Sequence, residues 1–294
     1  MPSLTFARRV ILPIFFAPPS ALNVLIPSSP VRLPLIPAKV NRQHQRSYSS
    51  PSHLLWIPPA IYILPIPAIT ESAKSELISI FGTRLGPQTP VNAQADSNGF
   101  IETQLAGTQV FMQGVAAPVL YTSDGRVNAV VPFSLYGYPE LLVQVAYNNV
   151  LSDAIVIQMW PVAPIVFTSS TSGQPVPIVV NQDGSINSPS NPAAPLSAIT
   201  FYGSGFGLTT PTGTDGHIAT APLPKPALPV TAGFGGEPVN VLYAGDVLGM
   251  VEGVVQVNLL VPKDAYTGDL SVIVGGVEMD FTIYVGGTQT TTAR

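Results

Sequence analysis

From about Glu76 onward, hydrophobic and polar residues alternate along the chain with a period of two, as in β-strands whose faces meet different surroundings. Residues 255–261 show this alternation, and it recurs over residues 141–147, 155–159, 270–274 and 279–285. Turn-forming pairs rich in glycine, asparagine and aspartate separate these runs. Short strands with glycine and proline between them, and no helical period, predict an all-β fold of antiparallel β-sandwiches.

The same order of segments occurs twice in this part of the chain. The offset between the copies is 121 residues at first, then 122, and finally 130, so the second copy carries extra residues before its last matching segment. Repeated order at drifting spacing is typical of a duplicated domain whose length changes lie in loops. The matching segments are IFGTRLGPQTP (80–90) and FYGSGFGLTTP (201–211), PVLY (118–121) and NVLY (240–243), and VNAVVP (127–132) and VNLLVP (257–262).

These patterns divide the chain into five segments. The segment between the two predicted sandwiches is too hydrophobic for a free linker, and residues 165–167 and 176–180 each suit a strand. We expect it to pair onto one sandwich and to hold the two at a fixed angle. The predicted segments are a Pro-rich basic leader (1–75), a first sandwich (76–161), an ordered connector with a hairpin (162–196), a second sandwich (197–288) and a tail (289–294).

The leader differs in composition from the rest of the chain. Its first 70 residues hold 13 prolines, six basic residues and no acidic residue. Arg8 and Arg9 precede an apolar run, as in a secretory signal, but Pro13 interrupts that run. Three interpretations remain open: a disordered Pro-rich leader, a degenerate signal or membrane anchor, and a mis-assigned start that adds residues without a fold.

Charge and cysteine content narrow the functional classes. Residues 71–294 contain six basic and 16 acidic residues, a formal charge of −10. Binding to nucleic acid requires phosphate neutralisation, so this acidic part does not suit it. The chain has no cysteine, which excludes disulfides, thiol catalysis and thiolate metal sites. Low charge without cysteine is compatible with bacterial export.

Several of these segments resemble a known family. The order LISIFGTRLGP, GVAAPVLY, VNAVVP, NQDGSINSPSNPAAPLSAITFYGSGFG, VVQVNLLVP and AYTGDLSVIVGGV is similar to an uncharacterised C-terminal domain family of Solibacter and other acidobacteria. The resemblance covers about residues 77–286, and single repeats resemble the IPT/TIG branch of immunoglobulin-like sandwiches. It implies two tandem immunoglobulin-like domains at the C-terminus of an exported protein, with no defined activity.

Two candidate sites for catalysis or a cofactor are weak on sequence grounds. His217 lies in a loop and is the only histidine after residue 70, and no nucleophile-elbow motif accompanies it. We therefore expect it to be solvated, and we predict no catalytic residue and no enzyme activity. The glycines of residues 203–207 do not open a helix, as a dinucleotide site requires. They predict a strand-end bend where backbones approach closely, and no cofactor.

Metal sites are also not expected. Oxygen-bearing side chains alternate along residues 181–187 around Gly184, as at the start of a calcium loop. The twelfth position is Pro192, which supplies no carboxylate, so the segment predicts a hydrogen-bonded hairpin turn and no metal. The acids of the repeats are scattered singly, mostly near turns, and we expect them to be solvated: Glu102, Asp124, Glu140, Asp153, Asp246 and Glu252.

Aromatic residues are the remaining candidates for ligand contact. Tyr121 and Tyr243 match between the copies, which predicts a core or hydrogen-bonded role for both. Tyr136 and Tyr138 fall in a predicted loop, so they are the candidate residues for contact with a ligand or partner. The other aromatics considered are Tyr202, Tyr284 and Trp160.

The sequence therefore predicts a non-catalytic, exported or cell-surface bacterial module that acts as a spacer, an anchor or a protein-binding surface. The alternative is a carbohydrate-binding or adhesive module that uses Tyr136 and Tyr138. The expected partner is a protein or a cell-surface polysaccharide and not a nucleic acid. Membrane contact is expected only if the leader is an uncleaved anchor.

Overall fold

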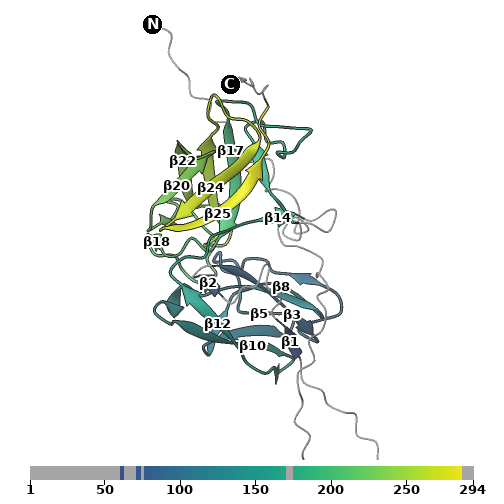
Figure 1. Cartoon of the computed structure of the whole chain (residues 1–294). Coiled ribbons are helices and arrows are strands. Elements are labelled where there is room, and N and C mark those ends of the chain that lie inside the picture. The colour runs from purple at the N-terminus through teal and green to yellow at the C-terminus, as the bar shows by residue number, and fades with distance from the viewer. Residues whose placement is uncertain (1–59, 63–70, 74–75, 170–174, 287–294) are drawn as a thin grey trace, which may run out of the picture.

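The computed structural model describes residues 60–62, 71–73, 76–169 and 175–286. Two β-sandwiches are stacked end to end, the first below the second in Figure 1. Within these residues the regular elements are strands, apart from one 3-10 turn, η2 (Phe133–Leu135). The all-β tandem sandwich fold is thus as predicted, whereas the predictions for residues 1–59 and for the tail, 289–294, lie outside the described residues.

The lower, N-terminal sandwich consists of two sheets. One has the order β1-β3-β9-β8-β4, and the other β2-β12-β10-β6-β5, with β11 and β7 attached to β10 and β6. Pairing is antiparallel except between β2 and β12. The strands are β1 (Ala60–Tyr62), β2 (Glu71–Ala73), β3 (Leu77–Thr83), β4 (Val91–Asn92), β5 (Gln104–Leu105), β6 (Thr108–Met112), β7 (Val115–Ala117), β8 (Val119–Ser123), β9 (Arg126–Val130), β10 (Glu140–Tyr147), β11 (Val150–Leu151) and β12 (Ile155–Trp160).

The C-terminal sandwich also has two main sheets. Their orders are β13-β17-β23-β22, with β16 on β17, and β21-β20-β24-β25, and two small ladders join β14 to β15 and β18 to β19. The strands are β13 (Ile165–Val166), β14 (Thr168–Ser169), β15 (Val176–Pro177), β16 (Val179–Asn181), β17 (Ala198–Ser204), β18 (Thr209–Thr210), β19 (Lys225–Pro226), β20 (Val230–Phe234), β21 (Glu237–Val239), β22 (Val241–Asp246), β23 (Val255–Leu260), β24 (Gly268–Val274) and β25 (Val277–Ile283).

The repeat seen in the sequence is also a repeat of topology. The order β3-β9-β8 corresponds to β17-β23-β22, and β7-β6-β10-β12 corresponds to β21-β20-β24-β25. A partly buried polar pair recurs as well, because the Ser79 hydroxyl bonds Asn128 Oδ1 at 3.0 Å and the Thr200 hydroxyl bonds Asn258 Oδ1 at 3.0 Å. Cross-strand pairs of this kind fix the register of two strands.

Each sandwich has its own hydrophobic core between its sheets. The N-terminal core includes Ile80, Leu85 and Leu141, and the C-terminal core includes Phe201 and Phe206. Leu85 and Phe206 occupy matching positions of the two copies, and both are almost fully buried. Burial of these inward faces is the main stabilising contribution to each sandwich.

Two segments extend the sandwiches beyond their repeated strands. β1 and β2 lie within residues 1–75, the predicted leader, and each adds an edge strand to one sheet of the N-terminal sandwich. Three-residue strands are too short to show alternation, which is why the sequence pattern missed them. In the connector, β13 and β16 both pair with β17, so this segment joins a sheet of the C-terminal sandwich.

Candidate functional site

The part of the molecule with the most unusual chemistry is the junction between the sandwiches, a third hydrophobic cluster built from both repeats. The N-terminal sandwich contributes Ile101, Leu120 and Val130 to this cluster. The connector and the C-terminal sandwich contribute Phe167, Val180, Tyr202, Val247, Val251 and Val254. We call this region the joint, and it places apolar surface of one repeat against the other.

The joint explains an irregularity of the N-terminal sandwich. Along β8 and β9 the residues that point away from the sandwich core are as buried as those that point into it. Leu120 and Val130 face the joint, whereas their neighbours Val119 and Ala129 belong to the N-terminal core. A sheet that is covered on both faces is hydrophobic on both, as these strands are.

The C-terminal repeat reaches the joint through its β22–β23 hairpin. The strands pair up to Asp246 and Val255, so a loop of residues 247–254 connects them. In the first repeat β8 and β9 pair up to Ser123 and Arg126, which leaves only a two-residue turn. Most of the extra residues that the sequence offset revealed therefore lie in the loop that carries Val247, Val251 and Val254.

Backbone hydrogen bonds cross between the sandwiches at the joint. The amide of Ile101 donates to the carbonyl of Gly216, and the amide of Ile218 donates to the carbonyl of Gly99, both at 2.8 Å. A third bond runs from the amide of Leu77 to Ser204 Oγ at 3.2 Å. Such bonds have fixed geometry, so they orient one sandwich relative to the other.

Asp215 adds a charged contact between the repeats. Its Oδ1 accepts a hydrogen bond from the amide of Phe133 at 2.5 Å, and its Oδ2 accepts one from the Ser134 hydroxyl at 2.9 Å. Both donors belong to η2, at its first turn, where amides lack partners within the helix. Asp215 of the C-terminal repeat thus caps a turn of the N-terminal sandwich.

His217 differs from the sequence prediction of a solvated loop residue. Its Nδ1 lies 2.7 Å from Glu252 Oε1, and its ring packs against Phe100 of the other sandwich with centroids 5.1 Å apart. Glu252 Oε2 also accepts a hydrogen bond from the amide of Thr214 at 2.6 Å. The histidine and the glutamate therefore join the loop of residues 247–254 to the segment that crosses the joint.

Asp246 and Glu252 also overturn the prediction that the acids are solvated, because both are buried, Asp246 with only 1% of its surface exposed. Asp246 Oδ2 accepts a hydrogen bond from the amide of Gly253 at 3.3 Å. No polar group of the described residues lies within hydrogen-bonding distance of Oδ1. The pKa of Asp246 is raised to about 7, mainly by burial; the hydrogen bond from the Gly253 amide opposes this rise, and the nearby charge of Glu252 adds to it.

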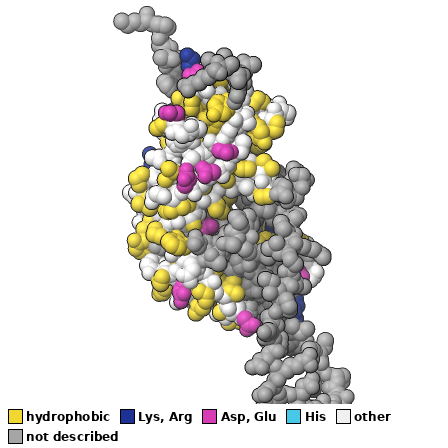
Figure 2. Space-filling model, in the orientation of Figure 1, with side chains coloured by type: hydrophobic (Ala, Val, Ile, Leu, Met, Phe, Trp, Pro, Cys, Tyr) yellow, Lys and Arg dark blue, Asp and Glu magenta, His cyan; other side chains and the backbone are white. Residues whose placement is uncertain are grey.

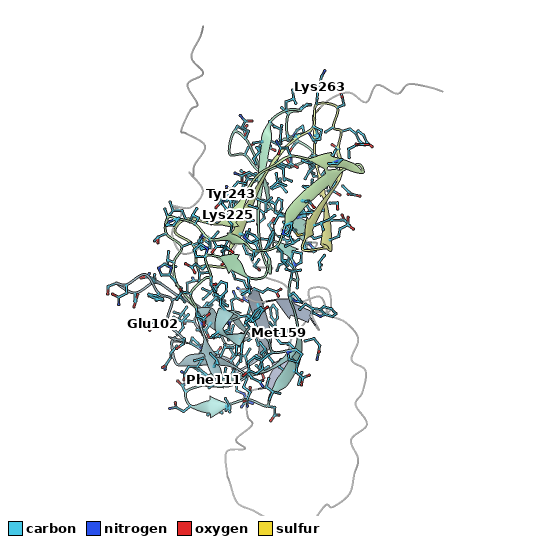
Figure 3. All side chains as sticks on the ribbon, turned by 90° about the vertical axis from the view of Figure 1, so that its left-hand side faces the viewer. Glu102, Phe111, Met159, Lys225, Tyr243 and Lys263 are labelled. Atoms are coloured by element: carbon cyan, nitrogen blue, oxygen red, sulfur yellow. The ribbon has the colours of Figure 1, made fainter. Side chains whose placement is uncertain are left out.

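The surroundings of Asp246 include a tyrosine that the sequence singled out. The hydroxyl of Tyr243 donates to the backbone oxygen of Asp246 at 2.9 Å, which confirms the predicted hydrogen-bonded role. Burial raises the pKa of Tyr243, and the charge of Asp246 adds to the effect. Figure 3 shows Tyr243 and Lys225 near the end of the C-terminal sandwich that faces the other sandwich, with Glu102 beyond them. Tyr121, the match of Tyr243, is buried as predicted.

The glycines of residues 203–207 make the close backbone approach that the sequence predicted. A Cβ on Gly203 would lie 2.1 Å from the carbonyl oxygen of Ile165, and one on Gly205 would lie 2.1 Å from that of Ala163. Gly205 also has a φ of 80°, which favours glycine. These contacts seat the start of the connector on β17.

Residues 181–187 form a hydrogen-bonded turn, as predicted. Asp183 Oδ1 accepts hydrogen bonds from the hydroxyl and from the amide of Ser185, the latter at 3.0 Å. The hydroxyl bond first, and the amide bond second, hold the pKa of Asp183 below its usual range. Asn187 bonds both the amide and the carbonyl of Tyr284, at 2.8 and 2.7 Å. The side chains that resemble a calcium loop are thus used to tie this turn to the end of the C-terminal sandwich.

The candidate contact residues, Tyr136 and Tyr138, are well exposed, at 64% and 46%. Trp160 is exposed at 48%, and the hydrogen bond from the amide of Met159 to the carbonyl of Pro139 brings the segments of Tyr138 and Trp160 together. The structure therefore places two tyrosines and a tryptophan at one end of the β10–β12 pair. Tyr202, in contrast, is buried in the joint.

Among the residues that the structure describes, no group of three or more His, Asp or Glu side chains is placed to hold a metal ion. In the same residues, no helix has both the length and the apolar character needed to cross a membrane.

Comparison with known proteins gives a broad likeness only. No family model matches the chain, and no curated protein matches its sequence. Among solved structures, the extracellular region of plexin A4 has a TM-score of 0.27 and 11% identity. The match covers 76% of this chain and 18% of the plexin chain. Domains 4 and 5 of the S-layer protein SbsC have a TM-score of 0.21 and 16% identity, over 71% of this chain and 82% of that one. A tandem of titin immunoglobulin domains has a TM-score of 0.21 and 10% identity, over 74% of this chain and 91% of the titin tandem.

At these TM-scores the likeness says nothing about function. Membership of the acidobacterial family therefore stays a prediction from the sequence. The residues that make the joint distinctive, Asp215, Asp246 and Glu252, were not recognised from the sequence as a group. For Asp246 and Glu252, the sequence signal is the rise of the repeat offset from 122 to 130 residues, which marks the inserted loop, and this signal does not extend to Asp215.

Proposed function

We propose that this chain is a non-catalytic, exported or cell-surface module in which two immunoglobulin-like sandwiches form one rigid spacer that presents a binding surface. The observation that carries the proposal is the joint. A spacer works by holding two ends at a fixed distance, so its domains must not move freely against each other.

The contacts of the joint favour rigidity over a flexible linkage. Domains within one chain move relative to each other unless their interface is large and hydrophobic. Here a buried apolar cluster, crossing backbone bonds and the Asp215 cap act together. The connector adds to this, because Phe167 and Val180 contribute to the same cluster that holds the two sandwiches.

Spin labels test this rigidity directly, since the chain has no cysteine of its own. Labels at Ala154→Cys and Lys263→Cys, both exposed and one in each sandwich, report the distance between them by double electron-electron resonance. The proposal predicts one narrow distance distribution. A control variant, in which Asp-Gly replaces residues 247–254, should give a broad one. A broad distribution in the unaltered chain at acid pH contradicts the rigid spacer.

The proposed place of this module is outside the cell, with a protein or a cell-surface polysaccharide as partner. The exposed acids Asp269, Glu278 and Asp280 lie on β24 and β25, where Figure 2 shows acidic side chains on one face of the C-terminal sandwich. This charge does not suit a nucleic-acid partner. The intact mass of the protein from the surface fraction of producing cells tests export, and a full-length protein confined to the cytoplasm contradicts it.

A second candidate function is adhesion to a polysaccharide through the exposed aromatics. Tyr136, Tyr138 and Trp160 lie at one end of the β10–β12 pair, and exposed aromatic rings give large apolar contact while their polar atoms stay hydrated. Binding to a panel of neutral glycans should be lost in a Tyr136→Ala, Tyr138→Ala variant. The control is Tyr266→Ala, an exposed tyrosine of the other sandwich. Equal binding by all three proteins contradicts this function.

A further inference from the structure

The joint contains a carboxyl group that has no compensating partner. Asp246 is the last residue of β22, and the next residue, Val247, begins the inserted loop and is part of the hydrophobic cluster. Its Oδ2 has one long hydrogen bond to the Gly253 amide, and its Oδ1 has no donor among the described residues. A buried carboxylate without partners is costly, and it lowers that cost by taking up a proton.

The groups around Asp246 do not neutralise a negative charge on it. Glu252 is the nearest charged group in the loop, and its own carboxylate is engaged with His217 and Thr214. From β22, Tyr243 approaches the backbone oxygen of Asp246. From the segment just before β19, the carbonyl of Pro224 accepts a hydrogen bond from the Asp246 amide, and the side chain of the next residue, Lys225, is exposed. The other acids that face the joint are Asp215, bound to η2, and the buried Glu76, which precedes β3.

We propose that the joint is a pH-sensitive hinge that is closed while Asp246 is neutral and loosens when Asp246 ionises. The inference rests on the proposed function, because it adds regulation to the same rigid joint. A neutral carboxyl can remain buried at the base of the loop that carries Val247, Val251 and Val254. An ionised one would be buried near the charge of Glu252 without a neutralising partner, and movement of the loop away from the N-terminal sandwich would let water reach it.

The pKa of Asp246 sets the window of the change. Burial raises this pKa from 3.8 to about 7, so the closed joint holds a proton that the opened joint releases. The closed form is therefore favoured at acid pH and loses its advantage as the pH rises through about 7. Between the two pKa values, from about pH 4 to about pH 7, the ratio of open to closed joint should rise by up to about tenfold for each pH unit, and above about pH 7 it should level off.

The doubly labelled full chain (Ala154→Cys, Lys263→Cys) tests the hinge by the same distance measurement at about pH 5.5 and about pH 8.5, on either side of the pKa. We expect one narrow distribution at the lower pH and the loss of that single distance at the higher pH. Asp246→Asn keeps the shape and the Gly253 bond without a titratable group, so it should stay narrow at both values. Asp124→Asn, in the corresponding hairpin of the first repeat, should still broaden.

Each of the other possible results overturns the inference, and each identifies which part of it is wrong. A narrow distribution at both pH values in the unsubstituted background contradicts the hinge and leaves the rigid spacer intact. A broad distribution at both values contradicts the rigid spacer, and the hinge with it. Broadening at the higher pH that persists in Asp246→Asn shows that another group is responsible, which removes Asp246 from the role assigned to it.

Discussion

The two repeats have the same strand order but different β-hairpins at one position. In the N-terminal sandwich the β8–β9 hairpin closes with the turn Asp124-Gly125. In the C-terminal sandwich the β22–β23 hairpin carries residues 247–254, which pack on the first repeat. A loop insertion, with the core strands unchanged, thus supplies the contact that joins two copies of one domain.

The two sandwiches also differ in how their matching sheets are buried. β8 and β9 are covered on both faces, because the joint lies on the side away from the N-terminal core. β23 keeps the simple alternation of a sheet with one core face, since Gln256 and Asn258 alternate with buried valines. The first repeat thus supplies the surface on which the second repeat docks.

The largest loss of stability is expected when the β22–β23 hairpin is shortened to match the β8–β9 hairpin. Replacement of residues 247–254 by Asp-Gly removes three buried valines from the joint, which costs on the order of 5 kcal/mol. Calorimetry should then show two separate unfolding transitions in place of one coupled transition. An unchanged single transition would contradict the role of the loop.

The next effect concerns pH, because Asp246 has no buried counterpart in the turn of the first hairpin. Its pKa is raised from 3.8 to about 7, so the folded protein binds more protons than the unfolded protein between those values. The contribution of this group to stability is therefore present below about pH 4 and is lost as the pH rises to about 7, by up to about 4 kcal/mol. Urea unfolding across this range should show a flatter pH dependence for Asp246→Asn. If the free energy of unfolding depends on pH equally in the two proteins, Asp246 does not make this contribution.

A smaller difference in stability is expected between substitutions at Gly205 and at Arg84, which occupies the matching position of the first repeat. Both have a positive φ, 80° and 58°, but only Gly205 lies under the connector. Gly205→Ala would place a Cβ 2.1 Å from the Ala163 oxygen, so we expect a loss of about 3 kcal/mol in urea unfolding. Arg84→Gly should stay within about 1 kcal/mol. Similar losses of stability for Gly205→Ala and Arg84→Gly would show that the close approach of Gly205 to the Ala163 carbonyl has no effect on stability.

The smallest effect is expected at Asp215. Asp215→Ala removes two hydrogen bonds to η2 and should cost about 2 kcal/mol, with partial loosening of the joint. Asp124→Ala, which changes an acid in the first hairpin, should change the free energy of unfolding by less than about 0.5 kcal/mol. Denaturant titrations of both variants measure the difference in free energy of unfolding. An equally large loss of stability in Asp124→Ala would contradict a specific role of the bonds between Asp215 and η2.

Much of the fold follows from local patterns in the sequence. Alternation located the main strands, and the repeat predicted two sandwiches with the same order of strands. The matched tyrosines and the glycines of residues 203–207 had the structural roles expected of them, because those roles depend on nearby strands of the same repeat.

The joint could not be predicted in the same way. Asp246, Glu252 and His217 lie in polar, turn-like surroundings in the sequence, where acids and histidines are ordinarily solvated. His217 packs on Phe100, more than a hundred positions away, and Glu252 and Asp246 contact other loops of their own repeat, which no local period records. Only the jump in the repeat offset shows where that contact begins.

The central claim, that the two sandwiches are one rigid body, is tested most directly by residual dipolar couplings of backbone amides in both. For a rigid joint, couplings from residues 76–161 and residues 197–286 should fit one common alignment tensor at acid pH. If the two sets require tensors of clearly different magnitude, the sandwiches move independently, and the account of the joint is wrong.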